Sequence, residues 1–199
     1  MVYSPHGGTT MNIICLGDSL TFGYGVWRSD CWVTLVANAT GLRVLNRGTN
    51  GDTSAYMYQR AKRRIVPYET EPGDIAIIMG GANDTLMYGA DESDVKNILN
   101  IAELFSAKNC TPIIGIQPGF KPSLEPFYGP MDLNKLNDNF DWFADKLITS
   151  AKDSNLKYFD LRSVLRDPGL FSDGVHPTEE GHRIISETVL KMIDPLIKA

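Results

Sequence analysis

The sequence IICLGDSLTFG, residues 13–23, joins a run of four apolar residues to a turn of glycine, aspartate and serine. A short, uninterrupted apolar run is typical of a parallel strand that is covered on both faces of a sheet. We therefore predict a strand at residues 13–16. Runs of the same character follow along the chain and predict four more strands, at residues 43–45, 75–79, 112–116 and 158–159.

Longer stretches with helical periodicity separate these apolar runs. Asp91 or Ser93, Asp132 and Thr178 stand where helix N-caps are expected. Regular alternation of strand and helix predicts an α/β fold, a three-layer α/β/α sandwich around a flavodoxin-like, five-stranded parallel sheet with right-handed crossovers. The predicted helices span residues 27–39, 53–65, 93–108, 133–152 and 177–193.

The length of 199 residues corresponds to one domain. Residues 1–10 are small and polar, whereas Met11 begins the first apolar run. We interpret residues 1–10 as a tail, a vector remnant or an upstream start, and residues 11–199 as a single domain. Hydrophobic residues make up 43% of the chain and charged residues 22%, as expected for a soluble globular protein.

The charge of the chain argues against nucleic acid and anionic membranes as partners, because 19 Lys and Arg against 24 Asp and Glu leave a net charge of -5. No apolar run approaches the ~18 residues of a membrane helix, and residues 1–10 lack the features of a signal peptide. The three cysteines, Cys15, Cys31 and Cys110, fit neither a zinc site nor a disulfide scaffold. We expect a cytoplasmic protein without stable membrane insertion, and the oligomeric state stays open.

Ligands of such folds bind beyond the carboxyl ends of the strands, so the turns at these ends are the first place to look for a site. Ser19 follows the first strand and is either a nucleophile near a helix N-terminus or part of an ordinary turn. Gly48 and Gly51 follow the second strand, and Asn83 follows the third. Their N–H groups and the asparagine amide are donors that can face a ligand, although each loop alone is equally typical of turn chemistry.

Near the C-terminus, Asp173 stands three residues before His176, ahead of the last predicted helix. An aspartate at this spacing can accept a hydrogen bond from Nδ1 of the imidazole and leave Nε2 free as a base. The chain has two other histidines: His6 lies in the tail, and His182 is expected to pack inside the last helix or face the surface. If the protein uses a histidine base, that base is His176.

Four segments in this order resemble the GDSL esterases and lipases of the SGNH hydrolase superfamily, over residues 11–193. They are Gly-Asp-Ser-Leu at 17–20, a glycine after the second strand, Gly-Ala-Asn-Asp at 81–84, and Asp-Gly-Val-His-Pro at 173–177. The resemblance implies the SGNH hydrolase fold. It also implies a serine hydrolase that cleaves carboxylic esters or thioesters through an acyl-enzyme, without a cofactor or metal.

The resemblance also assigns roles to residues. Ser19 would be the nucleophile, His176 the general base and then acid, and Asp173 its orienting partner. The oxyanion would be held by the N–H groups of Ser19 and Gly51 and by the Asn83 amide. Two alternatives stay open. Gly48 competes with Gly51, which is preferred because Gly-Asp-Thr at 51–53 resembles the family's pattern at the start of the following helix. Asp160, at the end of the fifth strand, competes with Asp173, which the Asp-x-x-His spacing favours. Asp18 and Asp84 are interpreted as acceptors that fix the loops.

The substrate is predicted only as a small-molecule acyl ester or thioester, because the family includes lysophospholipases, thioesterases and carbohydrate deacetylases. The proline-rich segment 117–131 and the aromatic residues after Ser19 are expected to form walls of the substrate site, with Tyr24, Phe120, Phe127 and Tyr128 as candidates. Two other functions are considered. One is a non-catalytic α/β binding module, and the other is a metal-dependent phosphoesterase with the ligands Asp18, Asn83, Asp84, Asp173 and His176.

Overall fold

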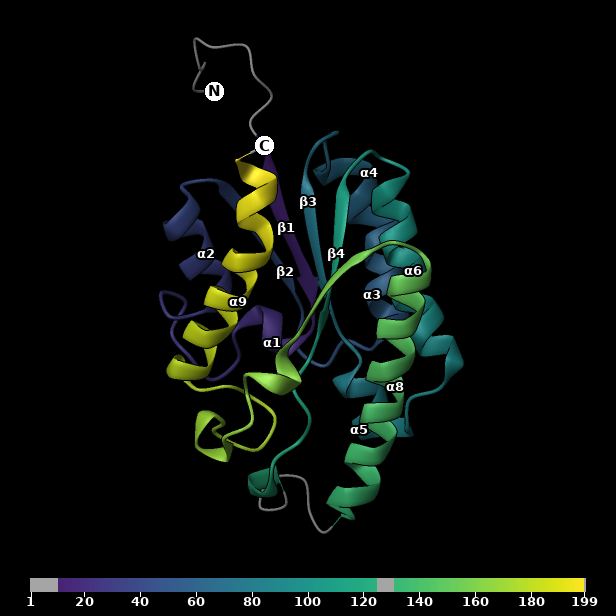
Figure 1. Ribbon diagram of the computed structural model, residues 1–199, viewed down its shortest axis with the longest axis vertical. Coiled ribbons are helices and arrows are strands. Elements are labelled where there is room, and N and C mark those ends of the chain that lie inside the picture. The colour runs from purple at the N-terminus through teal and green to yellow at the C-terminus, as the bar shows by residue number, and fades with distance from the viewer. Residues whose placement is uncertain (1–10, 125–130, 199) are drawn as a thin grey trace.

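The computed structural model describes residues 11–124 and 131–198, and the tail 1–10 lies outside them. Its centre is a sheet of five parallel strands in the order β2-β1-β3-β4-β5 (Figure 1). All five predicted strands are confirmed, and most are longer than the apolar run that predicted them. The strands are β1 (Asn12–Gly17), β2 (Arg43–Gly48), β3 (Ile75–Met79), β4 (Thr111–Ile116) and β5 (Lys157–Asp160).

The largest extension is that of β2, and pairing with β1 explains it. Asn46, Arg47 and Gly48 pair with residues 15–17 of β1, although no apolar residue occurs among the three. On its other side, β1 pairs with β3 so that Gly17 lies opposite Met79. This register brings the ends of β1, β2 and β3 to one edge of the sheet, and the loops that follow them meet there.

Helices cover both faces of the sheet, which confirms the three-layer sandwich (Figure 1). One face is covered by α2 (Trp32–Thr40) and α9 (Glu179–Ile197), which pack against each other. The other face carries α3 (Ser54–Arg60), α4 (Val66–Glu69), α5 (Ala82–Tyr88), α6 (Glu92–Ser106) and α8 (Leu133–Asp153). Asp91, Asp132 and Thr178 cap α6, α8 and α9 as predicted.

The helix predicted at residues 27–39 begins only at Trp32, and its predicted first turn is wrong. Cys31 has an extended backbone, with ψ 133°, which separates α2 from the turn formed by residues 27–31. This break lets the Trp32 side chain enter the core, where its indole N–H donates to the Leu20 carbonyl at 3.0 Å. The free energy gained by burying a large aromatic side chain is greater than that gained by one more helical turn.

The helix predicted at residues 53–65 continues further, through one π-helical turn over Ala61–Ile65 into α4. The wide turn precedes Pro67, which has no N–H to donate back to the helix. Two helices were not predicted at all: α5, and α1 (Ser19–Phe22). Both begin in loops at the ends of strands and are too short to produce a periodic pattern.

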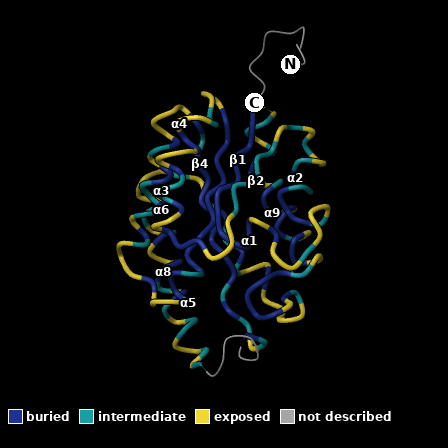
Figure 2. The backbone as a smooth tube through the Cα atoms, turned by 180° about the vertical axis from the view of Figure 1, so that it is seen from behind, coloured by how far each residue is buried: buried dark blue, intermediate teal, exposed yellow. Residues whose placement is uncertain are grey.

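The core lies between the sheet and the two helical layers, and the central strands form a buried band in Figure 2. The three cysteines are all buried and free. Within residues 11–124 and 131–198, no helix combines the length and the apolar character that are needed to cross a bilayer.

Candidate active site

The end of β1 and the start of α1 hold Ser19. Asp18 is the N-cap of α1, and its Oδ1 accepts from the Leu20 N–H at 2.9 Å. The helix ends after one turn at Gly23, which has φ 89°, a conformation that favours glycine. Ser19 is therefore the first residue of a short, capped helix, and its side chain is 5% exposed.

The loop between β5 and α9 brings His176 and Asp173 to Ser19. His176 Nε2 lies 2.9 Å from Ser19 Oγ, and His176 Nδ1 lies 2.6 Å from Asp173 Oδ2. Asp173 Oδ1 accepts from the N–H groups of Val175 and His176, at 3.0 and 2.8 Å. The carboxylate is thus fixed by the backbone of its own loop, and the imidazole connects it to the serine hydroxyl.

The electrostatics of this loop favour an ionised Asp173. Burial raises the pKa of its carboxyl, but hydrogen bonds from the His176 N–H, the His176 ring and the Val175 N–H outweigh burial and bring the pKa below its usual value. An ionised Asp173 accepts a hydrogen bond from Nδ1–H of the imidazole. Nε2 then carries no hydrogen and accepts from the Ser19 hydroxyl. This is the arrangement that a serine nucleophile needs.

The loop after β2 separates the two competing glycines. The Gly48 N–H donates to Asn46 Oδ1 at 2.9 Å, and a Cβ at Gly48 would lie 2.1 Å from the Phe22 nitrogen. Gly51 has φ 77° and is exposed. Within the described part of the chain its N–H donates no hydrogen bond, so Gly51 has a free donor where Gly48 does not.

Asn83 lies in the first turn of α5, and its side chain faces the Gly51 loop. Its Nδ2 donates to the carbonyl of Asp52 at 2.9 Å, which uses one of the two amide hydrogens. The second amide hydrogen stays available. Asp52 directly follows Gly51, so this bond places the Asn83 side chain at the Gly51 loop.

Asp18 and Asp84 fix these loops as hydrogen-bond acceptors, which confirms their predicted part. Asp84 accepts from the N–H of Ser54 at 3.0 Å and from its hydroxyl at 2.8 Å, and so joins α5 to α3. Burial raises the pKa of Asp84 to about 6 and that of Asp18 to about 7. The carboxyl of Asp18 also accepts from Gln117 Nε2 at 2.8 Å.

Two buried or half-buried side chains near this edge were not identified from the sequence. Arg60, at the end of α3, donates to Asp52 Oδ2 at 2.6 Å and to the carbonyls of Arg47 and Gly17 at 3.1 Å each. Gln117 follows β4 and is 1% exposed. Arg60 lies 43 residues from Gly17, and Gln117 lies 99 residues from Asp18, so no local motif could have indicated these contacts.

Two candidates have other partners. Asp160, the alternative to Asp173, binds the guanidinium of Arg162 through both carboxylate oxygens. His182 is fully buried in α9, where its Nδ1 accepts from the Trp32 N–H at 3.3 Å. Burial and the nearby His176 lower the pKa of His182 to about 4, so its ring is neutral around pH 7.

The predicted substrate-binding residues lie in different surroundings. The Tyr24 ring is half exposed and has its centroid 4.5 Å from that of His176, so it borders the catalytic histidine candidate. Phe120 is 4% exposed and packs edge-on against Phe140 in the core. Phe127 and Tyr128 lie outside the described residues.

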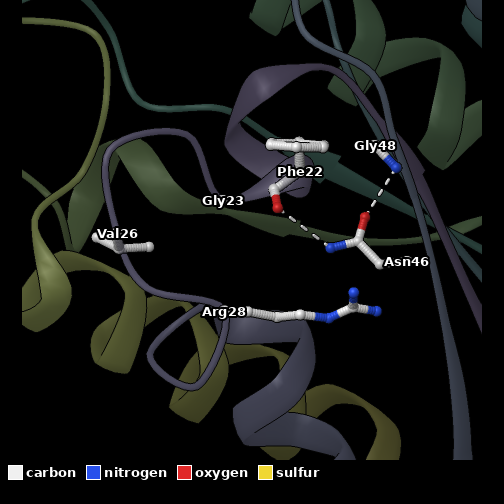
Figure 3. A pocket seen from close by; sticks show the side chains of 6 residues that line it. All are labelled: Phe22, Gly23, Val26, Arg28, Asn46 and Gly48. Carbon is white, nitrogen blue, oxygen red and sulfur yellow. Dashed lines mark hydrogen bonds between the residues drawn. The ribbon is translucent and has the colours of Figure 1, made fainter.

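Two hollows lie near this edge of the sheet. A cavity of about 280 Å³ is bounded by α1 and β2; Figure 3 shows the Asn46 amide between Phe22 and Gly48, with Arg28 across the hollow. A larger cavity of about 540 Å³ lies between α5 and α8, and its lining includes Leu86, Tyr88 and Leu136. Met131 adds to this apolar part, and Asp132, Lys135 and Asn139 form a polar part of the same lining.

The described residues contain no group of three or more His, Cys, Asp or Glu side chains that could hold a metal ion. The carboxylates proposed for a phosphoesterase have other partners: Asp18 binds Gln117, Asp84 binds Ser54, and Asp173 binds His176. This donor set does not favour the phosphoesterase.

Comparisons with known proteins match most of the chain. The profile of the GDSL-like Lipase/Acylhydrolase family matches residues 15–184. An Escherichia coli (strain K12) protein named Thioesterase 1/protease 1/lysophospholipase L1 is 24% identical over 187 residues, which cover 93% of this chain and 84% of that protein. An arylesterase from Vibrio mimicus is 22% identical over 182 residues, 89% of this chain and 85% of that protein.

The fold also matches solved structures. A crystal structure of a member of the lipolytic protein G-D-S-L family from Veillonella parvula DSM 2008 superposes with a TM-score of 0.80 at 25% identity. The superposition covers 92% of this chain and 98% of the Veillonella chain.

Proposed function

Because the chain belongs to the GDSL-like Lipase/Acylhydrolase family, we propose that it cleaves carboxylic esters or thioesters through a Ser19-His176-Asp173 triad and an acyl-enzyme. As a member of this family, the protein is a hydrolase that acts on ester bonds. The observation that carries the proposed triad is the pair of short distances at His176, 2.9 Å to Ser19 Oγ and 2.6 Å to Asp173 Oδ2.

In the proposed mechanism, Ser19 Oγ attacks the acyl carbonyl while His176 Nε2 takes the hydroxyl proton. The carbonyl oxygen becomes an oxyanion, which the N–H groups of Ser19 and Gly51 and the free Asn83 amide hydrogen stabilise. His176 then gives the proton to the leaving alkoxide or thiolate as the carbon–oxygen or carbon–sulfur bond breaks. A water molecule repeats the sequence on the acyl-enzyme and releases the acid.

For the substrate, we propose an ester or thioester of an apolar acyl chain. The cavity between α5 and α8 supports this, because Leu86, Met131 and Leu136 line part of it. Helix α5 begins at the residue before Asn83 and so runs from the proposed oxyanion site to the cavity. Tyr24, against the His176 ring, is proposed as the wall on the other side. A series of p-nitrophenyl esters from acetate to palmitate, beside acetylated xylan, measures the preference for chain length and for lipid or carbohydrate esters.

The first test replaces the nucleophile. Ser19→Ala is expected to abolish ester turnover and covalent labelling by a fluorophosphonate, because Ser19 supplies the one hydroxyl among the described residues that is hydrogen-bonded to His176 Nε2. Thermal unfolding of the same sample should stay close to that of the wild type, since the hydroxyl contributes little to packing. Labelling that persists at another serine would contradict the assignment.

A further inference from the structure

The Gln117 side chain connects two loops of the candidate site. Its Nε2 donates to Asp18 Oδ2 at 2.8 Å, and its Oε1 accepts from the Ala82 N–H at 2.9 Å. Asp18 directly precedes Ser19, and Ala82 directly precedes Asn83. One buried amide group thus spans the ends of β1 and β3 from its own place after β4.

We propose that Gln117 is a positioning residue, which holds Ser19 and the Asn83 amide at the separation that lets both reach one acyl carbonyl. The inference rests on the triad and oxyanion site proposed above. Gln117 touches neither the substrate nor the reacting atoms, so it acts through its two neighbours. Its contribution should therefore appear in turnover more than in substrate binding.

The geometry requires a glutamine because the two contacts need opposite chemistry on one rigid group. Asp18 presents a carboxylate oxygen, which needs a donor, and Ala82 presents an N–H, which needs an acceptor. The planar amide supplies both at a fixed distance. Asp18 passes this constraint to α1 because its other oxygen accepts from the Leu20 N–H. The Ala82 N–H lies in the first turn of α5 and has no acceptor within the helix. Gln117 supplies this acceptor and so also caps α5.

The ionisation of Asp18 also depends on its hydrogen bond from Gln117. Burial, and to a smaller extent the nearby Asp84 and Asp52, raise the pKa of Asp18 to about 7, although the hydrogen bonds from Gln117 and Leu20 oppose this rise. Among the described residues, Gln117 is the side chain that donates to Asp18. Without this donor, Oδ2 of the buried Asp18 carboxylate would lose its partner, which favours protonation or a movement of the loop that carries Ser19.

The experiment uses two variants of the full chain. Gln117→Met preserves length and volume but removes both hydrogen bonds. Gln117→Glu keeps an acceptor for the Ala82 N–H and places an oxygen opposite Asp18 instead of the donor. For each variant, kcat and KM for p-nitrophenyl acetate, the rate of fluorophosphonate labelling and the melting temperature are measured on one sample.

The matched control is Asn12→Leu, at the opposite end of the same sheet. Asn12 is buried, and its Nδ2 donates to the two carboxylate oxygens of Asp74 at 3.1 and 3.3 Å. The control therefore removes a buried amide–carboxylate contact of the same kind, away from the site. It should lower the melting temperature and leave kcat unchanged.

We expect both Gln117 variants to lower kcat about 10- to 100-fold with KM within about threefold, since a displacement of about 1 Å between reacting groups can cost about 10²-fold. Labelling of Ser19 should slow in proportion. The proposal is overturned if kcat stays within about twofold of the wild type, or if Asn12→Leu loses as much kcat for the same loss of melting temperature. If Gln117→Met does not fold, Gln117→Glu decides; if neither folds, Gln117 serves the fold and the proposal fails.

The two proposals fail in different ways. A wild-type protein that neither hydrolyses the ester nor reacts with the fluorophosphonate contradicts the proposed function. An active wild type with fully active Gln117 variants contradicts only the positioning role.

Discussion

Asn83 uses one hydrogen of its side-chain amide to fix its own orientation. The bond to the Asp52 carbonyl holds the amide at the residue that follows Gly51, and in the proposed mechanism the second hydrogen binds the oxyanion. A donor that is already oriented does not have to reorganise when charge develops, which is why such groups stabilise transition states more than ground states. The same residue thus links local loop structure to the proposed chemistry.

Asn83→Ala is expected to lower kcat about 10²- to 10³-fold, which corresponds to about 2.7 to 4 kcal/mol of transition-state stabilisation, with little change in KM. The lost bond to Asp52 should reduce the free energy of unfolding by only about 1 kcal/mol. Steady-state kinetics and urea unfolding of one sample measure both. Turnover at the wild-type level in a destabilised sample would make Asn83 a loop residue only.

His182 makes stability depend on pH through its burial. Its pKa is about 4 in the folded protein against an ordinary value of 6.5, so folding favours the neutral ring. The stability gained from the neutral ring is complete above pH 6.5 and is lost as the pH falls from 6.5 toward 4. The loss is on the order of 3 kcal/mol over this interval.

His182→Gln removes this titration and keeps a side-chain acceptor near the Trp32 N–H. Its free energy of unfolding should therefore fall less between pH 7 and pH 4 than that of the wild type, measured by urea unfolding at both values. The pH profile of kcat/KM should not move, because the His182 ring near His176 carries no charge around pH 7. An equal acid-induced loss of stability in the variant and the wild type would refute the burial argument.

At the scale of elements, α3 is attached to the ends of two strands by Arg60. The guanidinium binds Asp52 on the Gly51 loop, the carbonyl of Arg47 in β2 and that of Gly17 in β1. Five donors in one plane let a single side chain join three backbone segments. Together with Gln117, this bond set fixes the edge of the sheet at which the proposed site lies.

Arg60→Met should reduce the free energy of unfolding by about 2 to 4 kcal/mol, because it leaves Asp52 and two carbonyls without their donor. Arg47→Met is the matched control. Arg47 pairs with Glu69, but its side chain is 36% exposed against 24% for Arg60, so its loss should amount to less than about 1 kcal/mol. Urea unfolding measures both variants. Equal losses in the free energy of unfolding would show that the contacts of Arg60 with the two strands do not contribute to stability.

At the scale of the whole molecule, the residues of the proposed triad and oxyanion site lie at one edge of one sheet. The carboxyl ends of the parallel strands all lie at this edge, and the order β2-β1-β3-β4-β5 puts β1 between β2 and β3. The loop after β5 then reaches this edge through Asp173 and His176. The proposed site therefore depends on the sheet and on both helical layers at once.

We expect residues 11–199 to unfold as a single cooperative domain. Trp32 in α2 and Trp142 in α8 lie in helices on opposite faces of the sheet, so tryptophan fluorescence reports on both layers. In urea, the fluorescence transition and the far-UV circular dichroism transition should coincide. Two separated transitions would show that the layers unfold independently.

The sequence by itself predicted the fold class, the five strands and three helix caps, and through its resemblance to a known family it indicated the candidate catalytic residues. These features are local: apolar runs, N-cap side chains and the spacing of Asp173 and His176 are contained in a few consecutive residues. The preference for Gly51 over Gly48 as an oxyanion donor also came from the residues that directly follow Gly51. Periodicity could not detect α1 or α5, because one or two helical turns are too short.

Only the tertiary structure decided which polar groups meet across the chain. The Ser54 hydroxyl donates to Asp84, His176 Nε2 lies beside Ser19 Oγ, and Phe120 is in the core, none of which a local pattern specifies. Gln117 lies 99 residues from Asp18, and Arg60 lies 43 residues from Gly17. The physical reason is that a buried polar group must find a partner wherever the fold places one, and that partner is set by the packing of strands.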